Sequence, residues 1–312
     1  MASAGFSGAP EGQLRPARAT ANVASVASKA AEENFPVALR LLPSRRRRYL
    51  MAVYVYARTV DDIGDRAPVA DRSGLLAEVE ADLHRLYGAV RAGGRRDAES
   101  LNPLSPGAPK LEAVRGLRDA VTQCGIPIQP FLDLIEANRQ DQVVSRYQAI
   151  DDLLGYCRLS ANPVGRIVLY VFGCFTDARA ELSDSICSAL QLAEHWQDVA
   201  EDYRDGRIYL PADDMAEFGC DERDLAASAA SPQLKRLMSA EVARARVMLD
   251  AGAPLVGTLR GTARVAVAGY LAGGRAALAA ITAAGFDVLT STPRPGRART
   301  LTELLRALAR GR

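Results

Sequence analysis

Apolar residues recur at intervals of three and four along most of the chain, which is the spacing of one face of an α-helix. Persuasive alternation of apolar and polar residues, which would indicate strands, is absent. Gly and Pro residues separate the helical patterns, most clearly in the loop predicted at 93–109. The sequence therefore predicts an all-α chain. The predicted helices lie at about 23–32, 36–41, 45–65, 73–92, 110–123, 128–142, 149–157, 162–176, 181–203, 232–250, 254–283 and 300–310.

Two acidic clusters lie within these apolar patterns. The first reads DDIGD from Asp61 to Asp65, and the second reads DVAED from Asp198 to Asp202. Residues four apart on a helix lie one above the other, so each cluster presents a pair of carboxylates on one face. Because like charges at this spacing repel by roughly 0.2–0.5 kcal/mol per pair, we expect cations to compensate them.

Magnesium is the cation that suits such carboxylates. Mg²⁺ prefers oxygen ligands, keeps several waters and commonly bridges a few carboxylates to substrate phosphates, and two facing helices could supply those carboxylates. The alternative is that both clusters are solvated helix faces, as charge runs usually are, but two clusters in apolar surroundings favour a magnesium-diphosphate site. The predicted metal ligands are Asp61, Asp62, Asp65, Asp198 and Asp202.

Arginines near the clusters have two interpretations each. Arg58 could bind a diphosphate oxygen through bidentate hydrogen bonds or pair with Asp61 or Asp62, and the two roles are compatible. Arg207 follows the second cluster, where a cation also complements the dipole of the preceding helix. The basic run 45–48 is more typical of a solvated face or of contact with an anionic surface, so we exclude it from the site.

The composition narrows the classes of function. Hydrophobic residues make up 48% and charged residues 24% of the 312 residues, which is ordinary for a globular protein. A net charge of +2 gives no general case for nucleic-acid binding, so any electrostatic function must be local. Five cysteines without metal-like spacing indicate buried, reduced thiols. No export segment or spanning helix is predicted, so a cytoplasmic protein is expected.

Domain organisation follows from where the helical patterns begin and end. Residues 1–22 are rich in Ala, Gly, Pro and Arg without periodicity, which predicts a mobile tail. The helical patterns and the paired acidic clusters of 23–290 predict a single helical bundle around a central active-site cavity. Residues 291–312 are expected to form a C-terminal tail with a short helix.

Three segments together resemble one family. RTVDDIGD at 58–65, QLAEHWQDVAED at 191–202 and RIYLP at 207–211 are similar to the motifs of the squalene/phytoene synthase family, and the likeness extends over about 30–290. The resemblance implies an isoprenoid synthase fold and Mg²⁺-assisted loss of diphosphate from a prenyl substrate. It implies that Asp61, Asp65, Asp198 and Asp202 bind metal, that Arg58 and Arg207 lie near the diphosphate, and that Phe35, Tyr54 and Gln191 line the cavity. Together with Trp196 and Tyr209, the last five are the predicted substrate-binding residues.

The sequence also departs from the family pattern. Head-to-head synthases usually read Gln-x-x-Asn-x-x-Arg-Asp in the second motif, whereas Glu194 and Gln197 stand at the Asn and Arg positions here. Those synthases also carry Tyr-Cys-x-Tyr, whose last tyrosine is implicated in proton transfer, and Leu159 stands in its place. Because leucine cannot move a proton, these changes disfavour the complete condensation of two farnesyl diphosphates.

The motif from Trp196 to Asp198 and the segment 156–165 resemble instead the hydroxysqualene synthase branch of bacterial hopanoid pathways. This resemblance implies a Mg²⁺-dependent carbon-oxygen lyase. Presqualene diphosphate would ionise, and after rearrangement water would capture the cation to give hydroxysqualene and diphosphate. The protein would hold Mg²⁺ on the leaving group and stabilise the developing charge, without a hydride donor.

Three residues directly before the second cluster have more than one possible role. Trp196 could offer its π face to a carbocation, worth about 1–2 kcal/mol when desolvated, or anchor the packing between helices. Gln197 could position the attacking water because its amide both donates and accepts hydrogen bonds. His195 could act as a general base, although a packed or exposed histidine is favoured. The predicted catalytic residues are Asp61, Asp65, Gln197, Asp198 and Asp202.

Two other functions remain as alternatives. A head-to-head prenyl transferase making presqualene diphosphate, squalene or phytoene is disfavoured by Leu159 and Gln197. A non-catalytic, membrane-associated assembly factor is disfavoured because all four spaced aspartates are present. The expected partner is presqualene diphosphate, with no nucleic acid. Peripheral contact with the inner membrane face and hand-over from a presqualene diphosphate synthase are left open.

Overall fold

The computed structural model describes residues 42–92 and 108–310, and within them it contains helices and no strand. The all-α prediction is therefore confirmed for these residues. The predicted helices at 23–32 and 36–41, and the tail 1–22, lie outside them. The helices are α3 (Ser44–Arg66), α4 (Val69–Ala92), α5 (Glu112–Gly116), α6 (Arg118–Cys124), α7 (Gln129–Gln140), α8 (Ile150–Ser160), α9 (Asn162–Val171), α10 (Asp177–Gln197), α11 (Val199–Arg204), α12 (Ala212–Glu217), α13 (Glu222–Leu225), α14 (Pro232–Gly252), α15 (Leu255–Thr258), α16 (Gly261–Ala283) and α17 (Arg297–Arg310).

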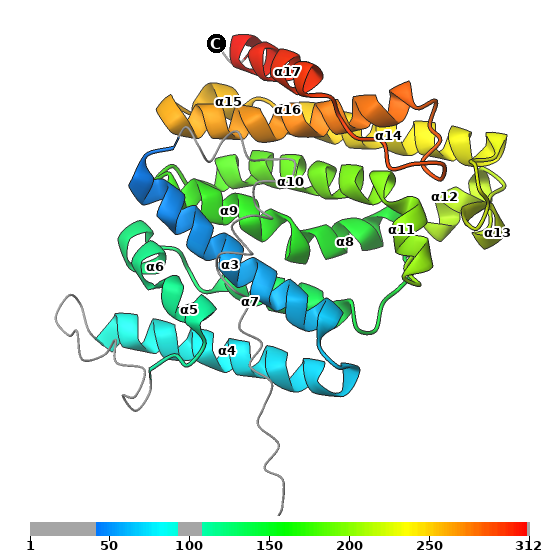
Figure 1. Ribbon diagram of the computed structural model, residues 1–312. Coiled ribbons are helices and arrows are strands. Elements are labelled where there is room, and N and C mark those ends of the chain that lie inside the picture. Colours follow the sequence, from blue (N-terminus) through cyan, green and yellow to red (C-terminus); the bar gives the residue numbers. More distant parts are fainter. Residues whose placement is uncertain (1–41, 93–107, 311–312) are drawn as a thin grey trace, which may run out of the picture.

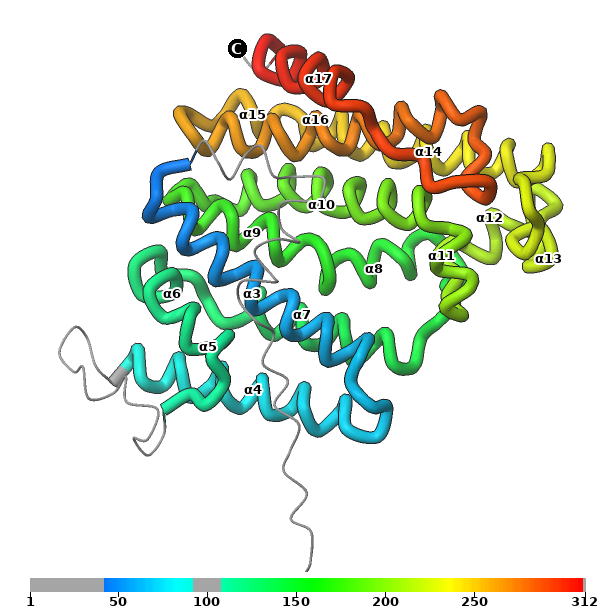
Figure 2. The backbone as a smooth tube through the Cα atoms, viewed as in Figure 1, coloured from blue at the N-terminus to red at the C-terminus, as the bar shows by residue number. Residues whose placement is uncertain are grey.

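The helix α10 lies at the centre of the bundle. It packs against α14 and α16 on one side and against α8 and α9 on the other (Figure 1). The helix α3 crosses in front of α7 and contacts it, and α4 packs below both. The tube in Figure 2 shows α17 lying over α16 at the top of the molecule. These layers enclose one continuous apolar core.

Close packing around α10 depends on a small residue in α14. A Cβ atom on Gly252 would lie only 2.6 Å from the backbone carbonyl oxygen of Leu182 and 2.5 Å from Cγ1 of Ile186. Glycine at this position lets the two long helices approach each other. The central helix that carries the second acidic cluster is thereby fixed against its neighbour.

Several predicted helix boundaries are wrong. The segment 181–203 is not one helix, because it breaks at Asp198, where φ is −104° and ψ is 15°. The Asp202 amide still donates to the Asp198 carbonyl at 2.8 Å, so the two aspartates remain one turn apart. The segment 254–283 also divides, because Leu259 is extended between α15 and α16. Such breaks involve only a few residues, and the apolar period continues through them.

Other helices differ from the sequence pattern for a similar reason. The predicted helix 110–123 is two helices, α5 and α6, which meet at Leu117. The short helices α12 and α13 were not predicted, because four to six residues are too few to show a helical period. The predicted short C-terminal helix is present as α17 and packs through Ala307, which is buried. The division of the chain into a domain and two tails stays a prediction.

One described helix, α16, is long and apolar enough to cross a membrane by length and composition. Its most apolar stretch is 67% buried inside the bundle, as expected of a core helix. The five cysteines are all free thiols, as predicted, but only Cys157 and Cys220 are fully buried.

Candidate active site

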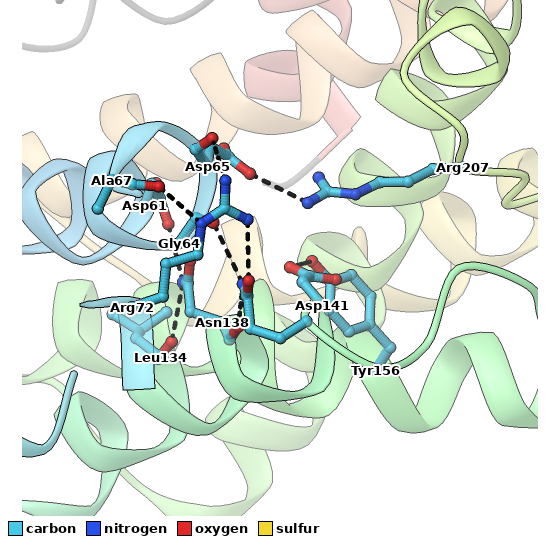
Figure 3. Close-up of polar contacts among 11 residues, drawn as sticks. Asp61, Gly64, Asp65, Ala67, Arg72, Leu134, Asn138, Asp141, Tyr156 and Arg207 are labelled. Atoms are coloured by element: carbon cyan, nitrogen blue, oxygen red, sulfur yellow. Dashed lines mark hydrogen bonds and ion pairs between the residues drawn. The ribbon is translucent and has the colours of Figure 1, made fainter. Parts of the chain in front are cut away.

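The first acidic cluster lies at the C-terminal end of α3, where α7 approaches it. Asn138 of α7 donates a hydrogen bond from Nδ2 to Asp61 at 3.1 Å and another to the Leu134 carbonyl at 3.1 Å (Figure 3). A Cβ atom on Gly64 would lie 2.2 Å from Oδ1 of Asn138. The glycine of the DDIGD motif therefore leaves the space in which Asn138 reaches Asp61.

The end of α3 is held by a cation from the next helix. Arg72 of α4 donates to the backbone carbonyls of Asp65 and Ala67, both at 2.9 Å, and to the side chain of Gln142 at 2.9 Å. Arginine at this position satisfies carbonyls that the helix itself leaves without partners. These bonds fix the last turn of α3 and with it the position of Asp65.

Asp62 points toward arginines of its own helix. Its Oδ1 atom lies 3.2 Å from Arg58 and 3.2 Å from Arg66. The pairing of Arg58 with Asp62 is therefore confirmed. Because Asp62 is already compensated by two guanidinium groups, its predicted role as a metal ligand gains no support here and stays a prediction.

Asp65 joins the first cluster to the segment after the second. Nη2 of Arg207 lies 3.1 Å from Oδ1 of Asp65, as Figure 3 shows. Arg207 is held by its own backbone, which donates to the Asp202 carbonyl at 2.8 Å. The next residue, Ile208, donates to the Ser145 carbonyl at 3.0 Å. These contacts bring both acidic clusters to the same end of the bundle.

Asp141 is a site residue that the sequence reasoning missed. The Tyr156 hydroxyl donates to its Oδ2 at 2.8 Å, and its buried Oδ1 has no hydrogen-bond partner among the described residues. Burial raises the pKa of this carboxyl, while the Tyr156 hydrogen bond and the nearby Arg207 oppose the rise and Asp65 adds to it. Asp141 therefore adds a third carboxylate beside Asp61 and Asp65. A single aspartate without a spaced partner gave no signal in the sequence.

Aromatic rings pack beside the second cluster. The His195 ring stacks on Tyr209 with centroids 3.6 Å apart, and Tyr209 stacks on Tyr147 at 5.9 Å. Nδ1 of His195 lies 3.8 Å from Asp202, and its Nε2 lies 3.2 Å from the Gln191 amide. His195 is thus a packed histidine, as favoured from the sequence, but it contacts the acidic cluster.

A small cavity of about 10 Å³ lies at this junction, lined by His195, Asp202, Arg207 and Tyr209 among others. That volume holds roughly one water molecule, and the lining supplies several polar partners for it. The predicted substrate-binding residues Arg207 and Tyr209 therefore lie together beside the second cluster.

Burial raises the pKa of one aspartate in each acidic cluster. Desolvation raises the pKa of Asp61 to about 6, against the opposing effects of Asn138 and Arg58. Desolvation, together with the neighbouring Asp202, also raises the pKa of Asp198 to about 6. A cation bound between such carboxylates would favour their charged forms.

The donors present suit magnesium. Among the described residues, no three or more His, Cys, Asp or Glu side chains form a cage that could hold a metal ion. Mg²⁺ needs no such cage, because it is commonly held by one or two carboxylates with waters and substrate phosphates. Undercompensated carboxylates at Asp61 and Asp198 provide oxygen donors of this kind. The oxygen donors present are therefore of the kind that a magnesium ion accepts.

Trp196 and Gln197, which precede the second acidic cluster, are both buried. Trp196 has no exposed surface, and its Nε1 finds no acceptor in the part of the chain that the structure describes. Gln197 is buried and donates from Nε2 to the Pro293 carbonyl. The structure thus places both side chains in packing contacts. This favours the anchoring interpretation of Trp196, and the roles predicted in catalysis and substrate binding stay untested.

Three further residues complete the comparison with the predicted site. Tyr54 is partly buried on α3, one turn before Arg58. Leu159 is partly buried and packs against the core, so the position where the resemblance places a tyrosine is apolar here. Phe35, predicted to line the cavity, lies outside the described residues.

The helical bundle, with both acidic clusters at one end, has the isoprenoid synthase fold. The chain matches the squalene/phytoene synthase family over residues 28–302, and it belongs to that family. It is 34% identical over 232 residues to the hydroxysqualene synthase of Sinorhizobium fredii. This match covers 73% of this chain and 72% of that protein. The same identity and coverage hold for the hydroxysqualene synthase of Rhodopseudomonas palustris.

A solved structure agrees with these relatives. The squalene synthase HpnC from Alicyclobacillus acidocaldarius matches with a TM-score of 0.72 and 36% identity, over 85% of this chain and 94% of that chain. The predicted family, the predicted isoprenoid synthase fold and the likeness to hydroxysqualene synthases are therefore confirmed.

Proposed function

We propose that this chain is a hydroxysqualene synthase, which converts presqualene diphosphate and water to hydroxysqualene and diphosphate in squalene and hopanoid biosynthesis. The observation that carries the proposal is the ion pair between Asp65 and Arg207, which brings both acidic clusters to one end of the bundle. The likeness to hydroxysqualene synthases supports the choice of reaction. Leu159 supports it as well, because the closure of a cyclopropane needs a base that leucine cannot supply.

In this proposal the chain is a carbon-oxygen lyase that releases diphosphate from presqualene diphosphate. The bond between carbon and the diphosphate oxygen would break, and the resulting cyclopropylcarbinyl cation would rearrange with opening of its three-membered ring to an allylic cation. The oxygen of water would then bond to that cation, and the water would give up its proton to the released diphosphate. Bound Mg²⁺ would neutralise charge on the leaving diphosphate. In our proposal the spaced aspartates of both clusters hold the ion: Asp61, Asp65, Asp198 and Asp202.

Arg207 binds the diphosphate in this proposal. Burial alone would lower the pKa of its guanidinium, but Tyr209, Asp141 and Asp65 raise it overall, so it stays charged. A fixed guanidinium suits the oxygens of a leaving diphosphate, where charge develops in the transition state. Arg58 assists from one turn before Asp62, with which it pairs.

The attacking water has a better candidate site than Gln197. The Gln197 amide is engaged with the Pro293 carbonyl, whereas the small cavity beside His195, Asp202 and Tyr209 has room for a water and polar groups to hold it. We place the water there. A His195→Phe variant should then yield less alcohol per presqualene diphosphate consumed, while Gln197→Arg should leave the alcohol fraction unchanged. If only Gln197→Arg lowers the alcohol fraction, Gln197 is the residue that positions the attacking water.

The test of the function uses two substrates side by side. Purified protein and Mg²⁺ are incubated separately with presqualene diphosphate and with farnesyl diphosphate in ¹⁸O-labelled water, without NADPH, and products are identified by mass spectrometry. Labelled hydroxysqualene from presqualene diphosphate alone is expected. Condensation products from farnesyl diphosphate would show the prenyl transferase instead. The absence of any product from either substrate would favour the non-catalytic assembly factor.

A matched control separates metal binding from folding. Asp198→Asn removes a charge at a position that is only partly buried, so it should abolish product without unfolding the bundle. Asp213→Asn, on an exposed turn of α12, should behave as the natural chain.

We place the enzyme in the cytoplasm, with peripheral contact at the inner membrane face, because both substrate and product are largely apolar.

A further inference from the structure

A second cavity lies at the other end of the bundle. Its volume is about 270 Å³, close to the lower bound of roughly 300 Å³ for small-molecule sites. It lies among the starts of α3, α10 and α16, which are close together at the left of Figure 1. At about 1.5 Å per residue along α3, Arg46 in this cavity is roughly 20 Å from Asp61, so the cavity is separate from the candidate active site.

Three arginines line the cavity without a carboxylate in the lining. They are Arg46, Arg179 and Arg260, and we call this cavity the arginine pocket. None of the three forms an ion pair with an acidic side chain within residues 42–92 and 108–310. Guanidinium groups gathered without counter-charges repel one another, so an anion in the pocket would be favourable.

Two of the guanidinium groups are held in place by neutral partners. Arg179 donates to the Thr258 hydroxyl at 3.2 Å, to the Thr258 carbonyl at 2.8 Å and to the Cys174 carbonyl at 2.9 Å. Arg46 donates to the Thr262 hydroxyl at 2.9 Å, and its guanidinium lies 5.4 Å from the centre of the Phe172 ring. Each guanidinium carries five N–H donors, so both retain donors for a ligand. Because these hydrogen bonds fix the two guanidinium groups before a ligand arrives, the entropy cost of binding is lower.

The Cys174 thiol lies close enough to two of these arginines to be influenced by their charge. Burial raises the pKa of Cys174, and Arg179 and Arg46 both act to lower it. Arg260 lines the same pocket and is exposed at its rim. Positive charge, fixed donors and one exposed arginine together match the demands of a multiply charged oxyanion.

We propose that the arginine pocket binds a phosphate group, supplied either as a free phosphate or by the headgroup of an anionic phospholipid. The two sources share the chemistry of tetrahedral oxygens that accept hydrogen bonds from guanidinium groups. The proposal does not depend on the function proposed for the acidic end, because it uses different residues.

The first arm of the test uses inorganic phosphate. The full chain is titrated with phosphate by calorimetry in the absence of Mg²⁺, so that the acidic clusters cannot recruit phosphate through the metal. Arg260→Gln should weaken binding at least about tenfold, the loss expected for one hydrogen bond between charged groups. Arg236→Gln removes the same charge from an exposed position on α14 and should leave binding unchanged.

The second arm uses vesicles. Sedimentation of the full chain with vesicles of phosphatidylcholine alone is compared with vesicles that also contain phosphatidylglycerol. The headgroup would be identified as the source if the natural chain binds only the vesicles that contain phosphatidylglycerol. Arg260→Gln should then lose this binding, and Arg236→Gln should keep it. Phosphate binding without vesicle binding would identify the free anion.

Two results would overturn the proposal. One is that the natural chain binds neither phosphate nor anionic vesicles. The other is that Arg260→Gln and Arg236→Gln weaken binding equally, which would reduce the effect to general surface charge. Because Arg260 is exposed, its variant should unfold at the same temperature as the natural chain, so loss of folding does not confuse the comparison.

Discussion

Nη2 of Arg207 lies 3.1 Å from Oδ1 of Asp65, although the two residues are 142 positions apart in the chain. One belongs to the segment after the second acidic cluster, and the other ends the first. This contact, together with the Tyr156 hydrogen bond to Asp141, defines the polar end of the bundle.

Replacing Arg207 by Gln should impair catalysis more than folding. The ion pair with Asp65 is substantially exposed, and exposed pairs contribute at most about 1 kcal/mol to the free energy of unfolding. Loss of a fixed donor to the leaving diphosphate should lower kcat by about 100-fold. Arg223→Gln breaks an exposed pair with Asp221 elsewhere and should change neither quantity. Steady-state kinetics and urea unfolding of both variants check this. Equal kcat in Arg207→Gln and the natural chain would contradict the assignment.

Replacing Gly64 by Ala should displace Asn138. The added Cβ would lie 2.2 Å from Asn138 Oδ1, so the Asn138 side chain must turn and lose its bond to Asp61. Activity should fall about tenfold or more, the effect of one hydrogen bond to a charged group. Gly88→Ala is the matched control, because no atom lies within 4 Å of its Cβ and the helix should gain up to about 1 kcal/mol. Similar activity for Gly64→Ala and Gly88→Ala would show that Asn138 does not position Asp61.

Magnesium dependence should change with pH near 6. Burial raises the pKa values of Asp61 and Asp198 from 3.8 to about 6. Between these values the folded chain binds protons that the unfolded chain does not, so stability falls as pH rises through this window. The same carboxyls must be charged to bind a cation, so protons compete with Mg²⁺ below pH 6. The Mg²⁺ concentration for half-maximal activity should therefore be higher at pH 5.5 than at pH 7.5. A constant value would argue against these ligands.

Glu241 should destabilise the fold at alkaline pH. It is 1% exposed, and burial raises its pKa from 4.5 to about 7, although Arg244 acts against the rise. Its raised pKa means that the stability it contributes is complete below pH 4.5 and is lost as pH rises through 7. In Glu241→Gln, the fall in the free energy of unfolding between pH 5 and pH 8 should shrink by roughly 2–3 kcal/mol.

Urea unfolding at both pH values measures this effect. Glu217→Gln, at an exposed position on α12, is the control and should keep the pH dependence of the natural chain. An unchanged pH dependence in Glu241→Gln would mean that Glu241 stays charged in the fold, compensated by Arg244.

The sequence predicted the parts of the site that depend on local spacing. The long helices α3, α10 and α16 and the pairs Asp61/Asp65 and Asp198/Asp202 all follow from periods of three and four. The break at Asp198 was missed, because a single turn can change direction without changing the apolar period. The family followed from motif resemblance and is confirmed.

The sequence by itself determined an all-α chain, two paired acidic clusters and the family they resemble, because helical period and motif spacing are properties of neighbouring residues. Only the tertiary structure decided that Asp141 joins the acidic end, that Gln197 is held by Pro293, and that Arg46 meets Arg179 at the other end. These contacts join residues far apart in the chain. Their geometry depends on how packed helices place side chains, which no local pattern encodes.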